Sequence, residues 1–313
     1  MGSLFTLVIG LRFQVGADWF SYLAYVDRAA AMSLLEVVTN GDPGYYLLNW
    51  LAVKLGGNIY WVNLVSGAIL MAGIVAFARR QPLPWLALLV AVPYLIIVVG
   101  MGYTRQAVAL GFVLLGLVAL GDGRVRTFVF WVLIGAAFHK SAVLMLPVAG
   151  LAASQSRFIS LAWGAAASLV GGYLFLFDSV DQLWANYVEA DYQSQGGLIR
   201  VLMNAVPAIM FLLFNRRMRL NRSEQRLWWW MSVFAIACIP LVVLSSTATD
   251  RVALYLIPLQ LFVFSHLHLI VSGGTSRGFI VLGVVAYYTL VQAVWLFFAA
   301  HAYAWLPYRV VGL

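Results

Sequence analysis

Three arginines stand at the borders of long apolar stretches: Arg12, Arg105 and Arg251. A guanidinium group stays charged in proteins and pairs bidentately with phosphate oxygens. Charges within or at the outer ends of apolar segments are costly and usually functional. If the three arginines meet in one cavity, they would bind a diphosphate. The alternative for Arg12 and Arg105 is that each anchors a helix end by extending its side chain to the membrane interface.

Two further residues, His139 and Asp18, could exchange protons with a substrate. Either would act as a general base if it lay within hydrogen-bonding distance of a reacting hydroxyl. His139 stands with Lys140 inside an apolar stretch, where the alternative is a structural histidine with a hydrogen-bond partner. Asp250 and Arg251 are adjacent, so they could also form a local ion pair in a loop.

Other catalytic and metal-binding signatures are missing from the sequence. It contains no Gly-x-Ser-x-Gly, no His-Glu-x-x-His, no nucleotide-binding glycine-rich loop and no Asp-x-Asp pair. Cys238 is the single cysteine, which excludes an intrachain disulfide and a cysteine-based metal site. His266 and His268 are two residues apart and do not share a helix face. We therefore expect no metal ion and no cofactor, and a cytoplasmic nucleotide-sugar enzyme is disfavoured.

The amino-acid composition indicates the class of protein in which these residues lie. Of the 313 residues, 64% are hydrophobic and only 10% are charged, with a mean hydropathy of +0.93. A soluble core could not hide so much apolar surface behind so few charges. The net charge of +8 comes mostly from arginines in linkers and at helix ends, so it indicates membrane topology and no nucleic-acid partner. The chain is predicted to be a polytopic membrane protein.

Eight apolar stretches are suitable for crossing a membrane as helices. They lie at about 58–78, 83–100, 105–120, 158–177, 198–214, 227–245, 252–271 and 278–299. Residues 1–11 are predicted to be the end of a first transmembrane helix rather than a signal peptide. We therefore expect an all-α bundle of about 9 to 11 transmembrane segments, forming a single membrane domain over residues 1–313.

The linkers predict the orientation of the bundle. The linker 215–226 carries five arginines and is expected to face the cytoplasm, together with Arg79–Arg80 and the turn 124–126. The segment 178–197 contains four acidic residues and no Lys or Arg, which indicates the outer side. The external segments are expected at about 12–57, 178–197, 246–251 and 300–313, with a helix over 45–55 lying in the outer interface.

Residues 127–154 connect two segments that are both expected at the cytoplasmic side. This stretch must therefore cross outward and return, and its polar centre at His139 and Lys140 predicts a broken helical hairpin there. Irregular backbone at membrane depth is tolerated where protein or a wet cavity satisfies it. The alternative is a single span through 127–151.

Several short blocks together resemble the EpsG-type family of bacterial polysaccharide polymerases, which are relatives of the Wzy O-antigen polymerases. The blocks are GLRFQVGADW at 10–19 with Tyr22, PGYYLLN at 43–49, RQAVA at 105–109, FHKSA at 138–142, and Arg251 with Tyr255. Two departures are the sequence Ala17-Asp18-Trp19, where the family more often has Thr-Asp-Tyr, and a short first helix.

The resemblance implies transfer of a glycan from a polyprenyl-diphosphate carrier to the non-reducing end of a carrier-linked repeat unit, on the outer face of the cytoplasmic membrane. The three arginines would then stabilise the leaving diphosphate without a metal. His139 or Asp18 would be the base, and glycan contacts are expected from Tyr22, Lys140, Asp250 and Tyr255. The expected partners are the two carrier-linked oligosaccharides, membrane lipid and a chain-length regulator protein. An O-antigen-ligase-like transferase and a lipid-glycan flippase or transporter are the alternatives.

Overall fold

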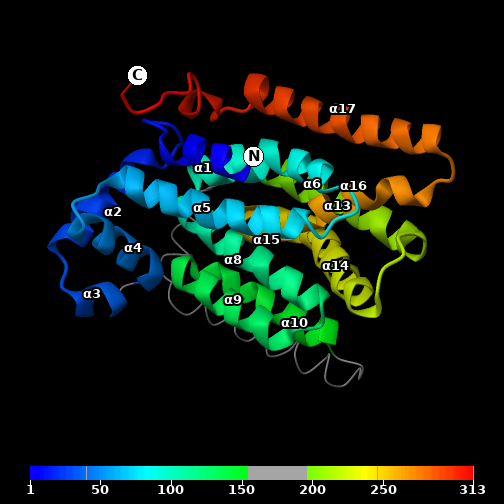
Figure 1. Ribbon diagram of the computed structural model, residues 1–313, viewed down its shortest axis with the longest axis horizontal. Helices are drawn as coiled ribbons and strands as arrows, with labels where there is room; N and C mark the ends of the chain where they lie inside the picture. Colours follow the sequence, from blue (N-terminus) through cyan, green and yellow to red (C-terminus); the bar gives the residue numbers. More distant parts are fainter. Residues whose placement is uncertain (40, 154–195, 245, 313) are drawn as a thin grey trace.

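The computed structural model describes residues 1–39, 41–153, 196–244 and 246–312, and this part of the chain is almost entirely helical (Figure 1). Seven helices in it are long and apolar enough to cross a membrane. They are Ile59–Ala78, Pro84–Gly102, Thr104–Gly121, Gly197–Arg217, Arg222–Val243, Thr249–Ile270 and Gly274–Phe298. These helices confirm the predicted all-α membrane bundle. The predicted span 158–177, and the predicted acidic external loop up to residue 195, lie outside the described residues.

Small residues set the closest helix packing in the first half of the bundle. Helix α5 (Ile59–Ala78) packs against α1 (Gly2–Gly10) and against α8 (Thr104–Gly121). A Cβ atom added at Gly73 of α5 would lie 2.2 Å from the carbonyl oxygen of Gly111 in α8. Only residues without a side chain allow two backbones to approach this closely.

The second span changes its helical geometry around Pro93. It consists of α6 (Pro84–Ala91), the π-helix η1 (Val92–Val99) and the short α7 (Gly100–Gly102). Proline lacks the N–H that an α-helix needs, so hydrogen bonding in this region is rearranged. The carbonyl of Ile97 accepts a hydrogen bond of 3.0 Å from the Trp305 indole, which ties the π-helix to the C-terminal segment.

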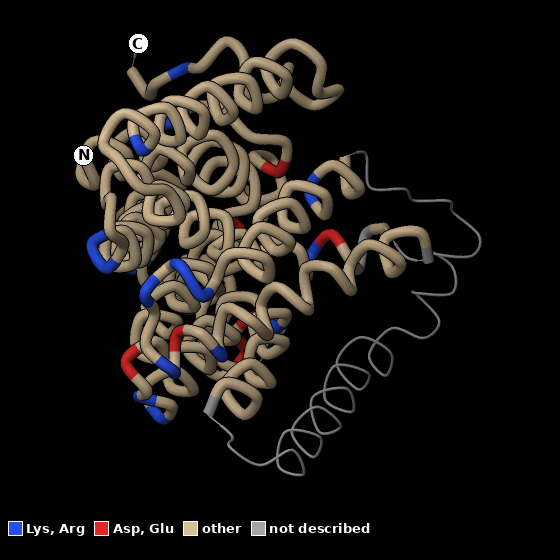
Figure 2. The backbone as a smooth tube through the Cα atoms, turned by 90° about the vertical axis from the view of Figure 1, so that its right-hand side faces the viewer, with Lys and Arg blue, Asp and Glu red and all other residues tan. Residues whose placement is uncertain are grey.

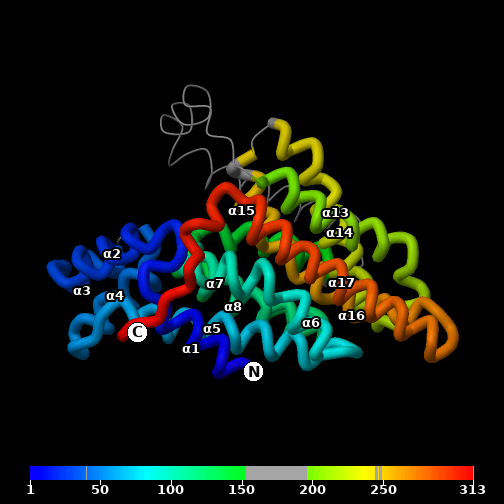
Figure 3. The backbone as a smooth tube through the Cα atoms, turned by 90° about the horizontal axis from the view of Figure 1, so that it is seen from above, coloured from blue at the N-terminus to red at the C-terminus, as the bar shows by residue number. Residues whose placement is uncertain are grey.

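The described residues from 197 onward form five α-helices and short 3₁₀ turns. The elements are α13 (Gly197–Phe214), η5 (Asn215–Arg217), α14 (Arg222–Leu244), α15 (Ser246–Leu256), α16 (Pro258–His266), η6 (Leu267–Ile270), α17 (Gly274–Phe298) and η7 (Ala302–Ala304). Helix α16 packs against α6 and joins the two halves. Figures 1 and 3 show α17 along the outside of the bundle, and only 11% of its apolar stretch is buried. Its apolar surface is therefore available to lipid.

The predicted helix break at His139 is present. Helix α9 (Val125–Phe138) ends there, and His139 has an extended backbone with φ of −155°. The chain continues as the 3₁₀ helix η2 (Lys140–Met145) and then as α10 (Leu146–Ala153), which packs back against α9 and against α14. The single straight span through 127–151 is therefore wrong, because the chain reverses where the polar residues interrupt the apolar pattern.

The basic turns gather at one end of the bundle, which we call the basic end. There Asp122 forms ion pairs of 3.0 Å with Arg80 and 2.9 Å with Arg124, and the Ser223 hydroxyl donates to the Leu120 carbonyl at 2.9 Å. The turn 215–226 lies at the same end, which faces the viewer in Figure 2. By the positive-inside rule, the basic end is expected to face the cytoplasm.

The segments 12–57 and 246–251 are more helical than the loops that we expected. Helices α2 (Trp19–Ala31), α3 (Leu34–Thr39) and α4 (Pro43–Lys54) follow one another at the left of Figure 1, and α15 begins at Ser246. Helix α4 matches the predicted helix over 45–55. Helices α2 and α3 are too short to span a membrane, so no long apolar run in the sequence marks them.

Candidate functional site

The candidate site lies at the end of the bundle remote from the basic turns, which we call the opposite end. Here the C-terminal segment pairs with residues 11–16, because Phe13 N–H donates to Arg309 O at 2.9 Å and Gly16 N–H donates to Ala304 O at 2.8 Å. Gly16 has a φ of +102°, and a Cβ on it would lie 2.2 Å from Met101 O. This tight turn positions Asp18, which precedes α2.

Arg12 is fully buried beneath this surface. Its guanidinium donates to Ile9 O at 2.5 Å, Val15 O at 3.2 Å, Asn63 Oδ1 at 3.1 Å and Thr104 Oγ1 at 3.0 Å. Burial lowers the pKa of Arg12 to about 10, so the side chain stays charged at neutral pH. Arg12 therefore joins the turn after α1 to α5 and α8.

We expect Arg12→Gln to lower the thermal stability of the purified protein in the absence of any substrate. The substitution leaves buried acceptors without their charged donor, a loss of roughly 3 kcal/mol or more. Thermal unfolding in detergent measures it, with the exposed Arg309→Gln at the same end as the matched control. An unchanged melting temperature combined with weaker diphosphate binding would instead assign Arg12 to the substrate.

Arg105, in the first turn of α8, is only partly enclosed. Its Nη1 lies 2.6 Å from Asp42 Oδ2, its guanidinium stands 5.0 Å from the centre of the Tyr25 ring, and 32% of its side chain is exposed. The buried Nε has no hydrogen-bond partner among the described residues. A guanidinium has five N–H donors, so Arg105 keeps donors for an anion.

An aromatic cluster from α2 and α4 stands behind Arg105. The Tyr25 ring lies 5.5 Å from Tyr45 and 5.3 Å from Tyr46, and Tyr22 lies 5.8 Å from Tyr45. Tyr22 and Tyr45 are 4% and 0% exposed. Tyr22, predicted as a glycan contact, is therefore packed within the wall that supports the arginine.

Asp18 has a carboxylate that makes no hydrogen bond or ion pair with any described residue, although it is half-buried. Burial raises the pKa of Asp18, and the nearby charge of Arg105 opposes that rise. A carboxylate with free lone pairs and a raised pKa is suited to take a proton.

His139 takes part in a chain of hydrogen bonds between the hairpin and α15. Its Nδ1 accepts the Ser141 N–H at 3.3 Å, and the Ser141 hydroxyl lies 2.6 Å from the same nitrogen and 3.1 Å from the Tyr255 hydroxyl. Because the backbone N–H must donate, Nδ1 carries a lone pair, and the proton of the neutral ring is on Nε2. The buried Tyr255 hydroxyl then donates to Ser141, and Ser141 donates to His139.

The charges of three cations act on this imidazole. Arg105, Arg251 and Lys140 all lie close enough for their charges to act on His139, and the Arg251 and Lys140 side chains are exposed. The structure therefore brings together two of the three predicted arginines, with Arg12 sealed at the same end of the bundle.

Arg200 also lies at this end of the bundle, although no motif in the sequence indicated a role for it. Its Nε forms an ion pair with Asp250, and it also donates to the Tyr94 hydroxyl of the π-helix. The main ion pair of Asp250 is therefore with Arg200, and the suggested local pair with the adjacent Arg251 is wrong. Arg200 looked like an ordinary arginine at the start of an apolar helix, and nothing nearby in the sequence indicates a partner 50 residues away.

Comparison with known proteins gives one family. The sequence model of the EpsG family matches residues 1–310, a range that includes every residue of the site described above. No curated protein and no solved structure matches the chain. Among the residues described, no group of three or more His, Cys, Asp or Glu side chains could hold a metal ion.

Proposed function

Because the chain belongs to the EpsG family, we propose that it is a polysaccharide polymerase that transfers a glycan from a polyprenyl-diphosphate carrier to the non-reducing end of a carrier-linked repeat unit. The observation that carries this proposal is the group of cations around His139, at the end of the bundle remote from the basic turns. Arg105 and Arg251 are its two arginines. The reaction is placed at the outer face of the cytoplasmic membrane, as the positive-inside rule implies.

Arg105 and Arg251 are assigned to the diphosphate. When the bond between the anomeric carbon and the phosphate oxygen breaks, its electron pair stays on the diphosphate, and negative charge grows there. Preorganised guanidinium groups stabilise such charge and form strong, charge-assisted hydrogen bonds with phosphate oxygens. The buried Arg12 is assigned as a positioning residue, since its four contacts hold the turn that leads to Asp18.

Asp18 is assigned as the general base. The acceptor hydroxyl forms the new bond to the anomeric carbon and releases its proton to the carboxylate. His139 is the weaker candidate because its Nδ1 lone pair is occupied by Ser141, which leaves Nε2–H as a donor. We assign that N–H to a diphosphate oxygen. Of the predicted glycan contacts, Lys140 is exposed beside His139, whereas Tyr255 is buried behind it.

Extension of a polyprenyl-diphosphate repeat unit by the purified protein, with a chelator present, tests the proposal. We expect longer carrier-linked glycans without added metal, because arginines take the place of a metal at the leaving group. Chelator-sensitive extension would contradict that assignment. Transfer only to another lipid or protein acceptor would indicate a ligase-like enzyme. Movement of the lipid across vesicle membranes without lengthening would indicate a transporter.

A further inference from the structure

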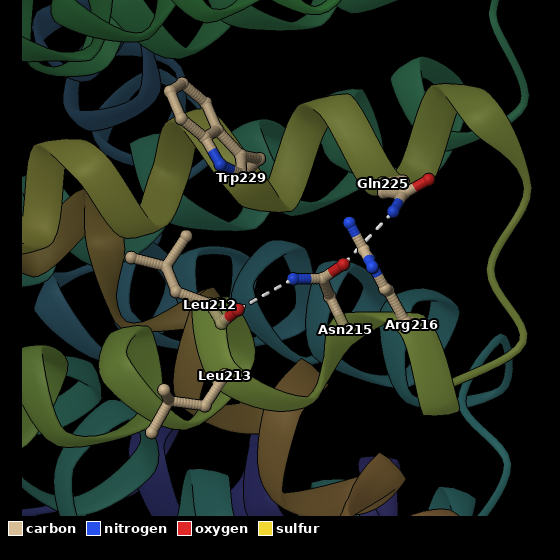
Figure 4. Close-up of a pocket in the computed structure, with 6 residues that line it drawn as sticks. All are labelled: Leu212, Leu213, Asn215, Arg216, Gln225 and Trp229. Atoms are coloured by element: carbon tan, nitrogen blue, oxygen red, sulfur yellow. Dashed lines mark hydrogen bonds between the residues drawn. The ribbon is translucent and has the colours of Figure 1, made fainter.

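A cleft of about 520 Å³ lies between α13 and α14 at the basic end, remote from the proposed active site. Its lining residues are Leu212, Leu213, Asn215, Arg216, Gln225 and Trp229. Figure 4 shows Arg216 rising from η5 toward Gln225 of α14. A neighbouring hollow of about 420 Å³ shares two of these residues and is lined by Arg222, Gln225, Arg226, Trp229 and Trp230.

The polar floor of the cleft is held in place by side-chain amides. Gln225 Nε2 donates to Asn215 Oδ1 at 3.1 Å, and Asn215 Nδ2 donates to Leu212 O at 3.0 Å (Figure 4). The acidic residue of this turn, Glu224, accepts the Asn221 N–H at 3.2 Å and so caps the start of α14. The charged residues that line the two hollows are therefore all arginines.

The walls of the cleft also expose large apolar side chains. Leu213 is 70% exposed and Trp229 is 42% exposed, although both lie beside arginines. Both helices belong to the candidate membrane spans. Arginine and tryptophan together at the end of a span are typical of the membrane interface, where a charged headgroup meets hydrocarbon.

We propose that the cleft and the neighbouring hollow together bind the headgroup of an anionic phospholipid from the leaflet at the basic end. The lipid phosphate pairs with Arg216 and Arg222, and the acyl chains lie along Leu213 and Trp229. A soluble phosphate would use the arginines alone, whereas a lipid explains both the cations and the exposed apolar walls. Lipid binding at this site does not depend on any step of the glycan transfer, so it can be tested separately from the enzymatic activity.

Native mass spectrometry of the full chain, released from detergent with added lipid, tests the site. We expect phosphatidylglycerol to be retained over phosphatidylcholine of the same chain length. Arg216→Gln with Arg222→Gln should weaken that retention roughly 10- to 30-fold, at about 1 kcal/mol for each lost contact between a guanidinium and the phosphate. Arg217→Gln with Arg219→Gln removes the same charge from the same turn, but neither residue lines the cleft or the neighbouring hollow, so it should change retention less than about twofold.

Three outcomes would overturn the proposal. The first is equal retention of phosphatidylcholine, and the second is equal weakening by the two double variants. The third is complete displacement of the lipid by millimolar inorganic phosphate, which would make the cleft a soluble phosphate site. All four substituted arginines are exposed, so the two double variants are matched in exposure, and circular dichroism of each variant checks that the helices are retained.

Discussion

Replacing Arg105 with glutamine is expected to reduce glycan extension by roughly 10²- to 10³-fold, the usual effect of removing one preorganised donor from a developing negative charge. Arg105 is the arginine whose charge reaches both Asp18 and His139, and of its guanidinium nitrogens only Nη1 is engaged among the described residues, by Asp42. Initial rates of chain extension measure the loss. Carrier-lipid binding should weaken as well, because the same charge holds the diphosphate before it leaves.

Arg28→Gln provides the matched control for this substitution. The Arg28 guanidinium stands 4.7 Å from the centre of the same Tyr25 ring, but it is exposed, and we assign it no substrate contact. Asp42→Asn provides the second control, because it removes the ion pair while leaving the charge of Arg105 in place. If Asp42→Asn were as damaging as Arg105→Gln, the arginine would serve only to hold α4 against α8.

The second large effect is expected from Asp18→Asn, which should lower extension roughly 10²- to 10⁴-fold, as the loss of a general base does. Burial raises the pKa of Asp18. Activity therefore requires a pH above this raised pKa, and it falls as the pH drops through it, at a higher pH than the usual aspartate value of about 3.9 would give. The residual activity of Asp18→Asn should lack this acidic limb, which a pH–rate profile measures.

His139→Ala separates the two candidate bases. If Nε2–H donates to the diphosphate, this variant should lose roughly 10- to 100-fold in rate, as for a hydrogen bond to a charged group. Its acidic limb should remain, because Asp18 still titrates. The assignment is reversed if His139→Ala abolishes extension and removes the acidic limb while Asp18→Asn keeps both rate and profile.

The sequence by itself determined the membrane bundle, because backbone hydrogen bonds within lipid must be satisfied inside each apolar segment. Seven spans could therefore be read from local composition alone. The break at His139 could be predicted for the same reason, since two polar residues interrupt an apolar run. The linkers that carry most of the arginines can likewise be identified from the sequence alone.

Only the tertiary structure decided which charges are sealed and which remain available. Arg12 and Arg105 look equivalent in the sequence. In the structure, however, the guanidinium of Arg12 donates to Asn63 and Thr104, whereas the Nε of Arg105 has no hydrogen-bond partner among the described residues. Asp250 pairs with the distant Arg200 instead of its neighbour Arg251. These partners are 50 or more residues apart, and local hydropathy carries no information about which helices pack together. Burial and donor capacity depend on that packing, so the roles of the charged residues emerge only in the folded chain.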